Sequence, residues 1–359
     1  MITQLTVKGF KTLKDFSVPL TPVSVLVGPN NCGKSNVLRA LTFLGLAVRV
    51  GVEEAIAQSG GAMEVFTRAG TNYLEISVEA EIGGTPVRYE IRGSDRGRGS
   101  EHLLVEGQVA IGNPPPINIG RSAHGSRLRE YVSRRPAADA VRQFCELLEG
   151  ISSADLSMDR LRAKSLPVPG IQLRANGENL AAVLDRLHGE SPSIRKKIEK
   201  ELSDVVPVIT GVVTPTVDAE GNKVVGIAEG DQVFKADAIS DGILLFLALS
   251  TVTQMSGGKT LVCLEEPDKG IHPRRIKEVI EQINRVAASG SQFLLTTHSP
   301  VLLNEFRDYP ESVLILDRPD PRGTVATRLS SLPDVQEQLR EVSLGDLWYS
   351  GVLGGVPSK

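Results

Sequence analysis

The chain has 359 residues, of which 41% are hydrophobic and 23% charged, and its formal net charge is −3. This composition is typical of one large globular domain carrying an insertion, or of two domains. It offers no apolar run of about 18 residues that would span a membrane, and its near-neutral charge means that affinity for nucleic acid must come from a local patch.

Residues 1–20 lack the apolar core of a signal peptide. The cysteines, Cys32, Cys145 and Cys263, form no C-x-x-C pair, which argues against a zinc site and a disulfide framework. We therefore expect a cytoplasmic protein.

Residues 1–50 are expected to form the first part of a nucleotide-binding core. Apolar residues alternate through 1–16, as in a strand and hairpin, and a β-branched run at 23–27 ends at Gly28. After four intervening residues come Gly33, Lys34 and Ser35, and then a predicted helix at 37–46. This is G-x-x-x-x-G-K-S between a strand and a helix, which predicts a phosphate-binding loop.

In such a loop the backbone N–H groups point at an anion, the lysine reaches the β- and γ-phosphates, and the serine hydroxyl ligates Mg²⁺. The alternative is a glycine-rich turn that happens to hold a lysine. The predicted nucleotide-binding residues of the loop are Gly28, Pro29, Asn30, Asn31, Cys32, Gly33, Lys34, Ser35 and Asn36.

The middle of the chain is expected to be an insertion. Residues 51–120 show period-two alternation between glycine-rich turns, which predicts an antiparallel β-lobe. Residues 121–206 change to helical spacing and are predicted to form a helical insertion, and residues 207–235 return as a β-hairpin.

Residues 236–359 are expected to complete the core. Predicted helices at 241–254, 273–288 and 300–307 alternate with continuously apolar strands at 260–264, 292–296 and 313–317. This alternation indicates a parallel sheet covered on both faces. The predicted fold class is α/β.

Two adjacent carboxylates follow the strand at 260–264. Glu265 would hold Mg²⁺ through water, and Glu266 would polarise the water that attacks the γ-phosphorus. The alternative is an acidic cluster that caps the helix after Pro273.

His298 follows the strand at 292–296, where it could hydrogen-bond the γ-phosphate. Together with Glu266 and Lys34 it is a predicted catalytic residue. His272 is equally well explained as a loop-shaping residue. Ser240, Asp241 and Gly242 open a predicted helix, and alone they indicate only an N-cap.

The order of these motifs resembles the ABC-type ATPase heads of the SMC, RecF and OLD (overcoming-lysogenisation-defect) branch. Residues 28–35 match the Walker A loop and residues 261–266 match Walker B with its catalytic glutamate. Ser240, Asp241 and Gly242 match the signature motif, residues 267–273 the D-loop, and His298 the switch histidine. The likeness is specific over residues 1–50 and 236–355 and implies a P-loop NTPase fold.

Three features depart from the usual pattern of ABC-type ATPases. The signature has Asp241 where transporters usually carry glycine, and Walker B has Glu265 where aspartate is usual; both of these departures are similar to the OLD-like branch. No Q-loop stands out, with Gln172 as the candidate. The resemblance implies a homodimer in which each ATP lies between one Walker A loop and the partner's signature serine, so that Ser240, Asp241 and Gly242 also bind nucleotide.

The resemblance also implies an ATP-driven switch that acts on DNA or on a separately encoded effector, such as a nuclease or toxin. OLD-family nucleases carry a metal-dependent TOPRIM domain after the ATPase core, and residues 330–359 are too few for such a domain, so we expect no cutting activity. The alternatives are the nucleotide-binding subunit of an ABC transporter and a small-molecule phosphotransferase.

One stretch is rich in arginine. It could give weak, sequence-independent DNA binding, or it could be a solvated helix face, which is the more common explanation of such a stretch. Its arginines are Arg121, Arg127, Arg129, Arg134, Arg135 and Arg142, with Arg92, Arg96 and Arg98 in a turn earlier in the chain.

Overall fold

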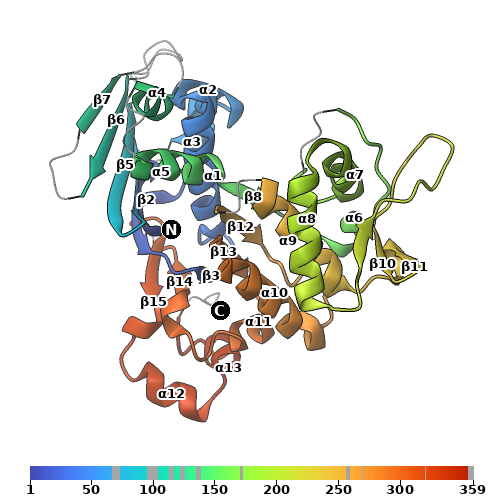
Figure 1. Ribbon diagram of the computed structural model, residues 1–359. Coiled ribbons are helices and arrows are strands. Elements are labelled where there is room, and N and C mark those ends of the chain that lie inside the picture. Colours follow the sequence, from blue (N-terminus) through green and yellow to red (C-terminus); the bar gives the residue numbers. More distant parts are fainter. Residues whose placement is uncertain are drawn as a thin grey trace.

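The computed structural model describes residues 1–66, 73–94, 104–112, 117–121, 126–134, 139–169, 173–255, 259–269, 271–319 and 321–354. Over these residues the chain forms two six-stranded sheets and one three-stranded sheet, with helices between and around them (Figure 1). No helix in these ranges has both the length and the apolar character needed to cross a bilayer.

The core sheet joins strands from the two ends of the chain. Its order is β15-β14-β3-β13-β12-β8, and all neighbouring strands are parallel except β14 and β15. The strands are β3 (Val23–Val27), β8 (Ser152–Ala154), β12 (Leu261–Glu265), β13 (Gln292–Thr297), β14 (Val313–Asp317) and β15 (Val325–Arg328). Every residue of β3 and β13 is buried, as expected for strands covered on both faces.

Alternate residues of these strands belong to two separate hydrophobic cores. Leu26 and Leu294 pack in the cluster that contains α1 (Lys34–Val50). Val25 and Leu295 pack in the cluster that contains α9 (Asp241–Met255) and α10 (Ile276–Ala288). The core sheet therefore has α1 on one face and α9 and α10 on the other.

The second six-stranded sheet is antiparallel, in the order β2-β1-β4-β5-β6-β7. Its strands are β1 (Ile2–Phe10), β2 (Leu13–Pro19), β4 (Tyr73–Ile82), β5 (Thr85–Ser94), β6 (Leu104–Ile111) and β7 (Ile117–Arg121). The strand pair at the start of the chain thus joins the sheet predicted for residues 51–120.

The expectation that this sheet begins at residue 51 needs correction, because α2 (Val52–Gln58) and α3 (Ala62–Val65) come first. Val52, Ala55 and Ile56 are buried at helical spacing.

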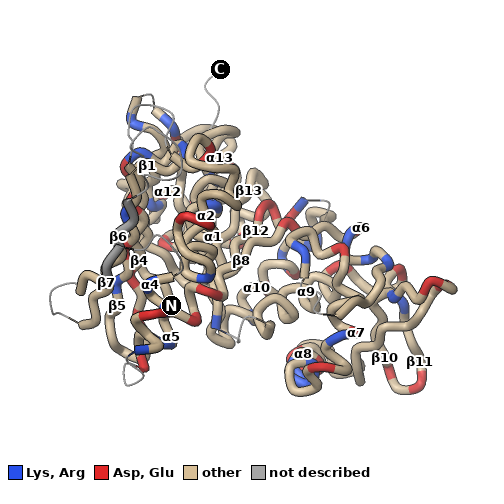
Figure 2. The backbone as a smooth tube through the Cα atoms, turned by 90° about the horizontal axis from the view of Figure 1, so that it is seen from above, with Lys and Arg blue, Asp and Glu red and all other residues tan. Residues whose placement is uncertain are grey.

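The helices predicted at 121–206 do not form one body. α4 (Arg127–Arg134) and α5 (Asp139–Glu149) pack beside α1 and the antiparallel sheet, and we call this assembly with α2 and α3 the β lobe. On the other side lie α6 (Met158–Leu161), α7 (Leu180–Glu190) and α8 (Pro192–Val205), with β9 (Gly211–Val213), β10 (Gly226–Glu229) and β11 (Gln232–Lys235). We call these elements, with α9, the helical lobe (Figure 2).

Short helices complete the chain. They are η2 (Ala236–Ala238), η3 (Pro273–Arg275), α11 (Pro300–Asn304), η4 (Pro310–Ser312), η5 (Leu329–Ser331), α12 (Val335–Glu341) and α13 (Leu344–Tyr349). A Cβ on Gly345 of α13 would lie 2.3 Å from the carbonyl oxygen of Pro300, so α13 packs directly on the start of α11. Leu339 and Trp348 are buried in the same core as α9, so the last helices pack against the body of the protein.

Candidate functional site

Three neighbouring parallel strands end side by side and carry the predicted catalytic residues. Val27 of β3 pairs with Thr297 of β13, and Thr296 pairs with Glu265 of β12. The phosphate loop, His298 and Glu266 therefore all begin at the same edge of the core sheet. Open α/β sheets bind ligands at the carboxyl ends of their strands.

The phosphate loop holds its lysine in a buried position. Lys34 is 7% exposed, and its Nζ donates hydrogen bonds to the carbonyl oxygens of Gly28 (2.8 Å) and Pro29 (3.0 Å). Burial lowers the pKa of the Lys34 ammonium, because the charged form loses solvation. Asn30 and Asn31 are exposed at the tip of the loop, and Ser35 and Asn36 are half-buried in the first turn of α1.

The two motif glycines sit where a side chain would collide with the protein. A Cβ on Gly28 would lie 2.3 Å from the carbonyl oxygen of Leu316 in β14. Gly33 has a φ of 110°, and a Cβ there would lie 2.2 Å from Oγ1 of Thr324. Both the backbone conformation and the close approach therefore require glycine at position 33.

Behind Gly33 lies a hydrogen-bonded group that the sequence did not reveal. The Thr324 hydroxyl, fully buried, donates to the carbonyl oxygen of Cys32 (2.7 Å) and lies 2.8 Å from the hydroxyl of Thr12. The Asn36 amide donates to the same Thr12 hydroxyl at 2.8 Å. We call Thr12, Asn36 and Thr324 the threonine network. No motif identifies it, because Thr12 and Thr324 are far apart in the sequence.

Glu266 and His298 meet at the ends of β12 and β13. Nε2 of His298 lies 3.8 Å from Oε1 of Glu266. Glu266 has a φ of 44°, and its N–H donates to the carbonyl oxygen of Thr296 at 3.1 Å. Backbone strain of this kind clusters at functional sites. Burial, and then the nearby Lys34 ammonium, lower the pKa of His298, so the imidazole is neutral at pH 7.

Asp268 is a second carboxylate beside these residues. It follows Glu266 in the predicted D-loop, and the Thr297 hydroxyl donates to its Oδ1 at 3.0 Å. The same hydroxyl accepts from the N–H of Ser299 (2.9 Å), which ties together the loops after β12 and β13. Burial raises the pKa of Asp268. The sequence placed Asp268 in the motif without giving it a role.

The predicted metal ligands are Ser35 and Glu265, both half-buried. Over the described residues, no group of three or more His, Cys, Asp and Glu side chains is placed to hold a metal ion. A hydroxyl and one carboxylate suit Mg²⁺, which usually keeps several waters and is shared with substrate phosphates. The donor set therefore fits a magnesium ion that binds together with a nucleotide.

The signature residues lie away from the loop that holds Lys34. Ser240, Asp241 and Gly242 stand at the start of α9, which packs against α6 and α8 in the helical lobe. The Ser240 hydroxyl lies 3.4 Å from the N–H of Ile243. In Figure 1 the helical lobe lies on one side of strands β12 and β13, and α1 lies on the other side. The structure thus brings Lys34, Glu266 and His298 together and places the signature elsewhere.

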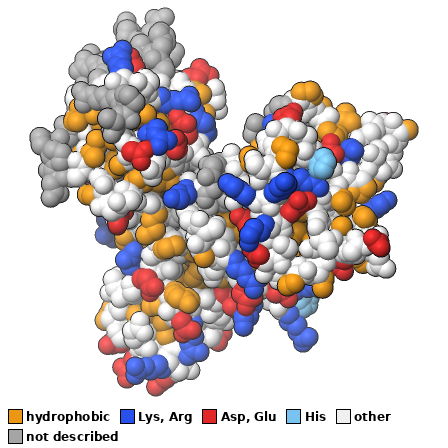
Figure 3. Space-filling model, viewed as in Figure 1, with side chains coloured by type: hydrophobic (Ala, Val, Ile, Leu, Met, Phe, Trp, Pro, Cys, Tyr) orange, Lys and Arg blue, Asp and Glu red, His pale blue; other side chains and the backbone are white. Residues whose placement is uncertain are grey.

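The arginines of α4 and α5 are paired with acids of the same helices. Arg129 lies 2.7 Å from Glu149, and Arg134 lies 2.6 Å from Glu130. Arg127 is paired with Glu130, and Arg142 with Asp139 and Glu146. Acidic and basic side chains are also interspersed over the face shown in Figure 3. These pairs favour the interpretation of a solvated helix face.

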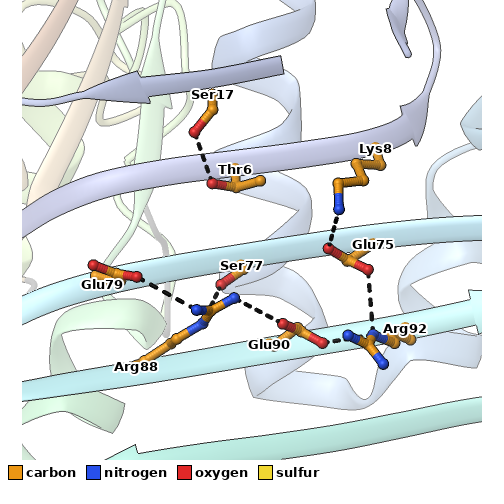
Figure 4. Close-up of polar contacts among 9 residues, drawn as sticks. All are labelled: Thr6, Lys8, Ser17, Glu75, Ser77, Glu79, Arg88, Glu90 and Arg92. Atoms are coloured by element: carbon orange, nitrogen blue, oxygen red, sulfur yellow. Dashed lines mark hydrogen bonds and ion pairs between the residues drawn. The ribbon is translucent and has the colours of Figure 1, made fainter. Parts of the chain in front are cut away.

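Arg92 is likewise neutralised, on the antiparallel sheet (Figure 4). Its Nε lies 2.6 Å from Glu90 and 3.2 Å from Glu75. Arg88 lies 3.1 Å from the same Glu90 and 3.6 Å from Glu79. Of the other residues singled out in the sequence, Arg96, Arg98, Arg135 and Gln172 lie outside the described residues.

The chain is similar to several known proteins. A family model described as "AAA domain, putative AbiEii toxin, Type IV TA system" matches residues 23–304. The Old nuclease of Escherichia phage P2 is 22% identical over 365 residues, which cover 92% of this chain and 61% of that protein. The OLD nuclease of Thermus scotoductus is 23% identical over 351 residues, covering 89% and 63%. The chain thus spans less than two thirds of the length of these curated relatives.

Among solved structures, one described as "Crystal structure of the SmcHead bound to the C-winged helix domain of ScpA" superposes with a TM-score of 0.56. It is 18% identical and covers 94% of this chain and 99% of that chain. This likeness confirms the expected fold: an α/β P-loop NTPase head with a mixed core sheet, an antiparallel lobe and inserted helices.

Proposed function

Because the chain belongs to the AAA-domain family whose model matches residues 23–304, we propose that it is an ATP-driven switch that hydrolyses ATP slowly. It is an ABC-type ATPase head of the SMC and OLD branch, related to the OLD nucleases. The observation that carries the proposal is the meeting of Lys34, Glu266 and His298 at one edge of the core sheet.

Each of these groups has a role in attack of water on the γ-phosphorus. Lys34 exchanges its hydrogen bonds to the loop carbonyls for the β- and γ-phosphates. Glu266 orients the water and takes its proton, and neutral His298 donates a hydrogen bond to a γ-phosphate oxygen. Ser35 and Glu265 would hold Mg²⁺, which would neutralise charge on the phosphates.

We further propose that two copies dimerise head to tail around ATP. The position of the signature supports this, because Ser240 directly precedes α9, which packs in the helical lobe, whereas Lys34 begins α1. In a dimer the start of α9 would instead face the partner's phosphate loop, where its free N–H groups favour an anion.

The output of the switch is proposed to be an effector nuclease or toxin, or DNA. The curated relatives are nucleases, and the family description names a toxin system. The change in nucleotide state would be transmitted first to α11, which begins two residues after His298. α13 packs against the start of this helix. A cytoplasmic location also remains part of the proposal.

The test uses the Glu266→Gln variant. We expect it to bind ATP, to lose hydrolysis by about 10²–10⁴-fold, and to run as a dimer with ATP and Mg²⁺ in light-scattering chromatography. Ser240→Arg in the same background should remain monomeric with ATP bound. The control is Glu281→Gln, on the exposed face of α10. Hydrolysis by Glu266→Gln at the parent rate would refute the assignment.

A further inference from the structure

Asp241 is the unusual residue of the Ser-Asp-Gly signature, and the structure shows what holds it. Arg162, directly after α6, places its Nη2 2.8 Å from Oδ1 of Asp241. The same nitrogen donates to the carbonyl oxygen of Ile239 at 2.8 Å. Both charged side chains are largely covered, with exposed fractions of 22% and 27%. One guanidinium thus fixes both the turn before α9 and the first residue of the helix.

The start of α9 would be a poor anion site without this arginine. Asp241 is the only charged residue in α9, all of which is described. A second carboxylate is close, because a Cβ on Gly242 would lie 3.5 Å from Oε2 of Glu278 in α10. Two carboxylates at this point would repel the phosphates of ATP and cancel the favourable effect of the helix N-terminus.

We propose that Arg162 is a positioning residue for the signature: it neutralises Asp241 and holds the turn, so that the start of α9 accepts the partner's γ-phosphate. This inference rests on the proposed head-to-tail dimer. The arginine's short bond to Asp241 and its second bond to Ile239 carry the proposal. Arg162, which lies 79 positions before Asp241 in the sequence, thus compensates for an aspartate where transporters usually carry glycine.

The prediction concerns dimer formation and not nucleotide binding by one subunit. In the Glu266→Gln background, Arg162→Ala should weaken ATP-dependent dimerisation by about tenfold or more, the range expected for loss of a charged hydrogen bond. ATP affinity of the monomer, measured in the Ser240→Arg background, should be unchanged, because Arg162 acts on the partner's nucleotide.

Removing the acid should remove the need for the arginine. Asp241→Asn combined with Arg162→Ala should restore most of the dimerisation lost in Arg162→Ala alone, and Asp241→Asn alone should dimerise at least as tightly as its parent. The matched control is Arg160→Ala in α6, whose side chain is 60% exposed and pairs with Glu178 at 3.3 Å. The control should dimerise as its parent does.

The outcomes separate the inference from the proposed function. If the Glu266→Gln parent fails to dimerise with ATP, the head-to-tail dimer itself is wrong. If the parent dimerises and Arg162→Ala matches it, Arg162 has no positioning role. If Arg162→Ala fails to dimerise and Asp241→Asn does not rescue it, charge compensation is wrong, and the arginine acts only through its bond to the carbonyl oxygen of Ile239. Thermal unfolding of each variant verifies that it is folded.

Discussion

Thr324→Val tests whether the threonine network supports the phosphate loop. Valine has nearly the same shape as threonine, so the substitution removes the hydroxyl and leaves the packing behind Gly33. The hydroxyl makes one bond to the carbonyl oxygen of Cys32 (2.7 Å) and one to Thr12 (2.8 Å). Each bond contributes about 0.5–1.5 kcal/mol, and a buried group left without its partner costs about 1–3 kcal/mol. We therefore expect the free energy of unfolding to fall by about 1–3 kcal/mol.

The measurement is urea unfolding at equilibrium, together with ATP affinity. ATP affinity should also fall, because the carbonyl of Cys32 precedes Gly33 in the loop and its orientation depends on Thr324. The control is Thr327→Val in β15, an exposed threonine three residues further along the chain, which should change stability by no more than about 0.5 kcal/mol. Equal stability of the two variants would refute the argument that the network supports the loop.

Three further predictions concern single residues. Lys34→Ala should abolish ATP binding, because among the described residues no other cation contacts the carbonyl oxygens of Gly28 and Pro29. Unchanged ATP affinity in calorimetry would contradict this. The lowered pKa of His298 means that the unfolded chain takes up a proton near pH 6.5 before the native protein does, so the free energy of unfolding should fall as the pH drops below 6.5. His298→Gln should lack this contribution in denaturation series at several pH values, and identical pH profiles would refute it. Arg134→Glu should leave affinity for duplex DNA unchanged in fluorescence anisotropy, because Arg134 is already neutralised by Glu130; a clear loss would restore the nucleic-acid interpretation.

The sequence predicted that Lys34, Glu266 and His298 lie at one edge of the core sheet, because each motif is local in the sequence. The loop from Gly28 to Ser35 carries its own signal, and Glu266 and His298 directly follow continuously apolar strands. The rule that parallel strands present their carboxyl ends together then brings these residues to one place. The register of β3, β13 and β12 agrees with that reasoning.

What the sequence could not show depends on contacts between distant segments. Thr12 and Thr324 meet behind Gly33 across a separation of 312 positions, and Arg162 reaches Asp241 from another helix. The start of the antiparallel sheet was misplaced for a different reason. The two helices at 52–58 and 62–65 are short, so each gives only a weak periodic signal beside the long strand pattern that follows them.

We propose that each ATP is shared between one subunit's Lys34 and the other's Ser240. A complementation experiment distinguishes this arrangement from sites that lie within one subunit. Lys34→Ala and Ser240→Arg chains are each expected to be inactive, and their mixture forms heterodimers with one intact composite site. We expect the mixture to regain ATP hydrolysis that neither variant shows alone, in proportion to heterodimer formed. A mixture as inactive as its components, with heterodimers present in the solution, would contradict the shared site.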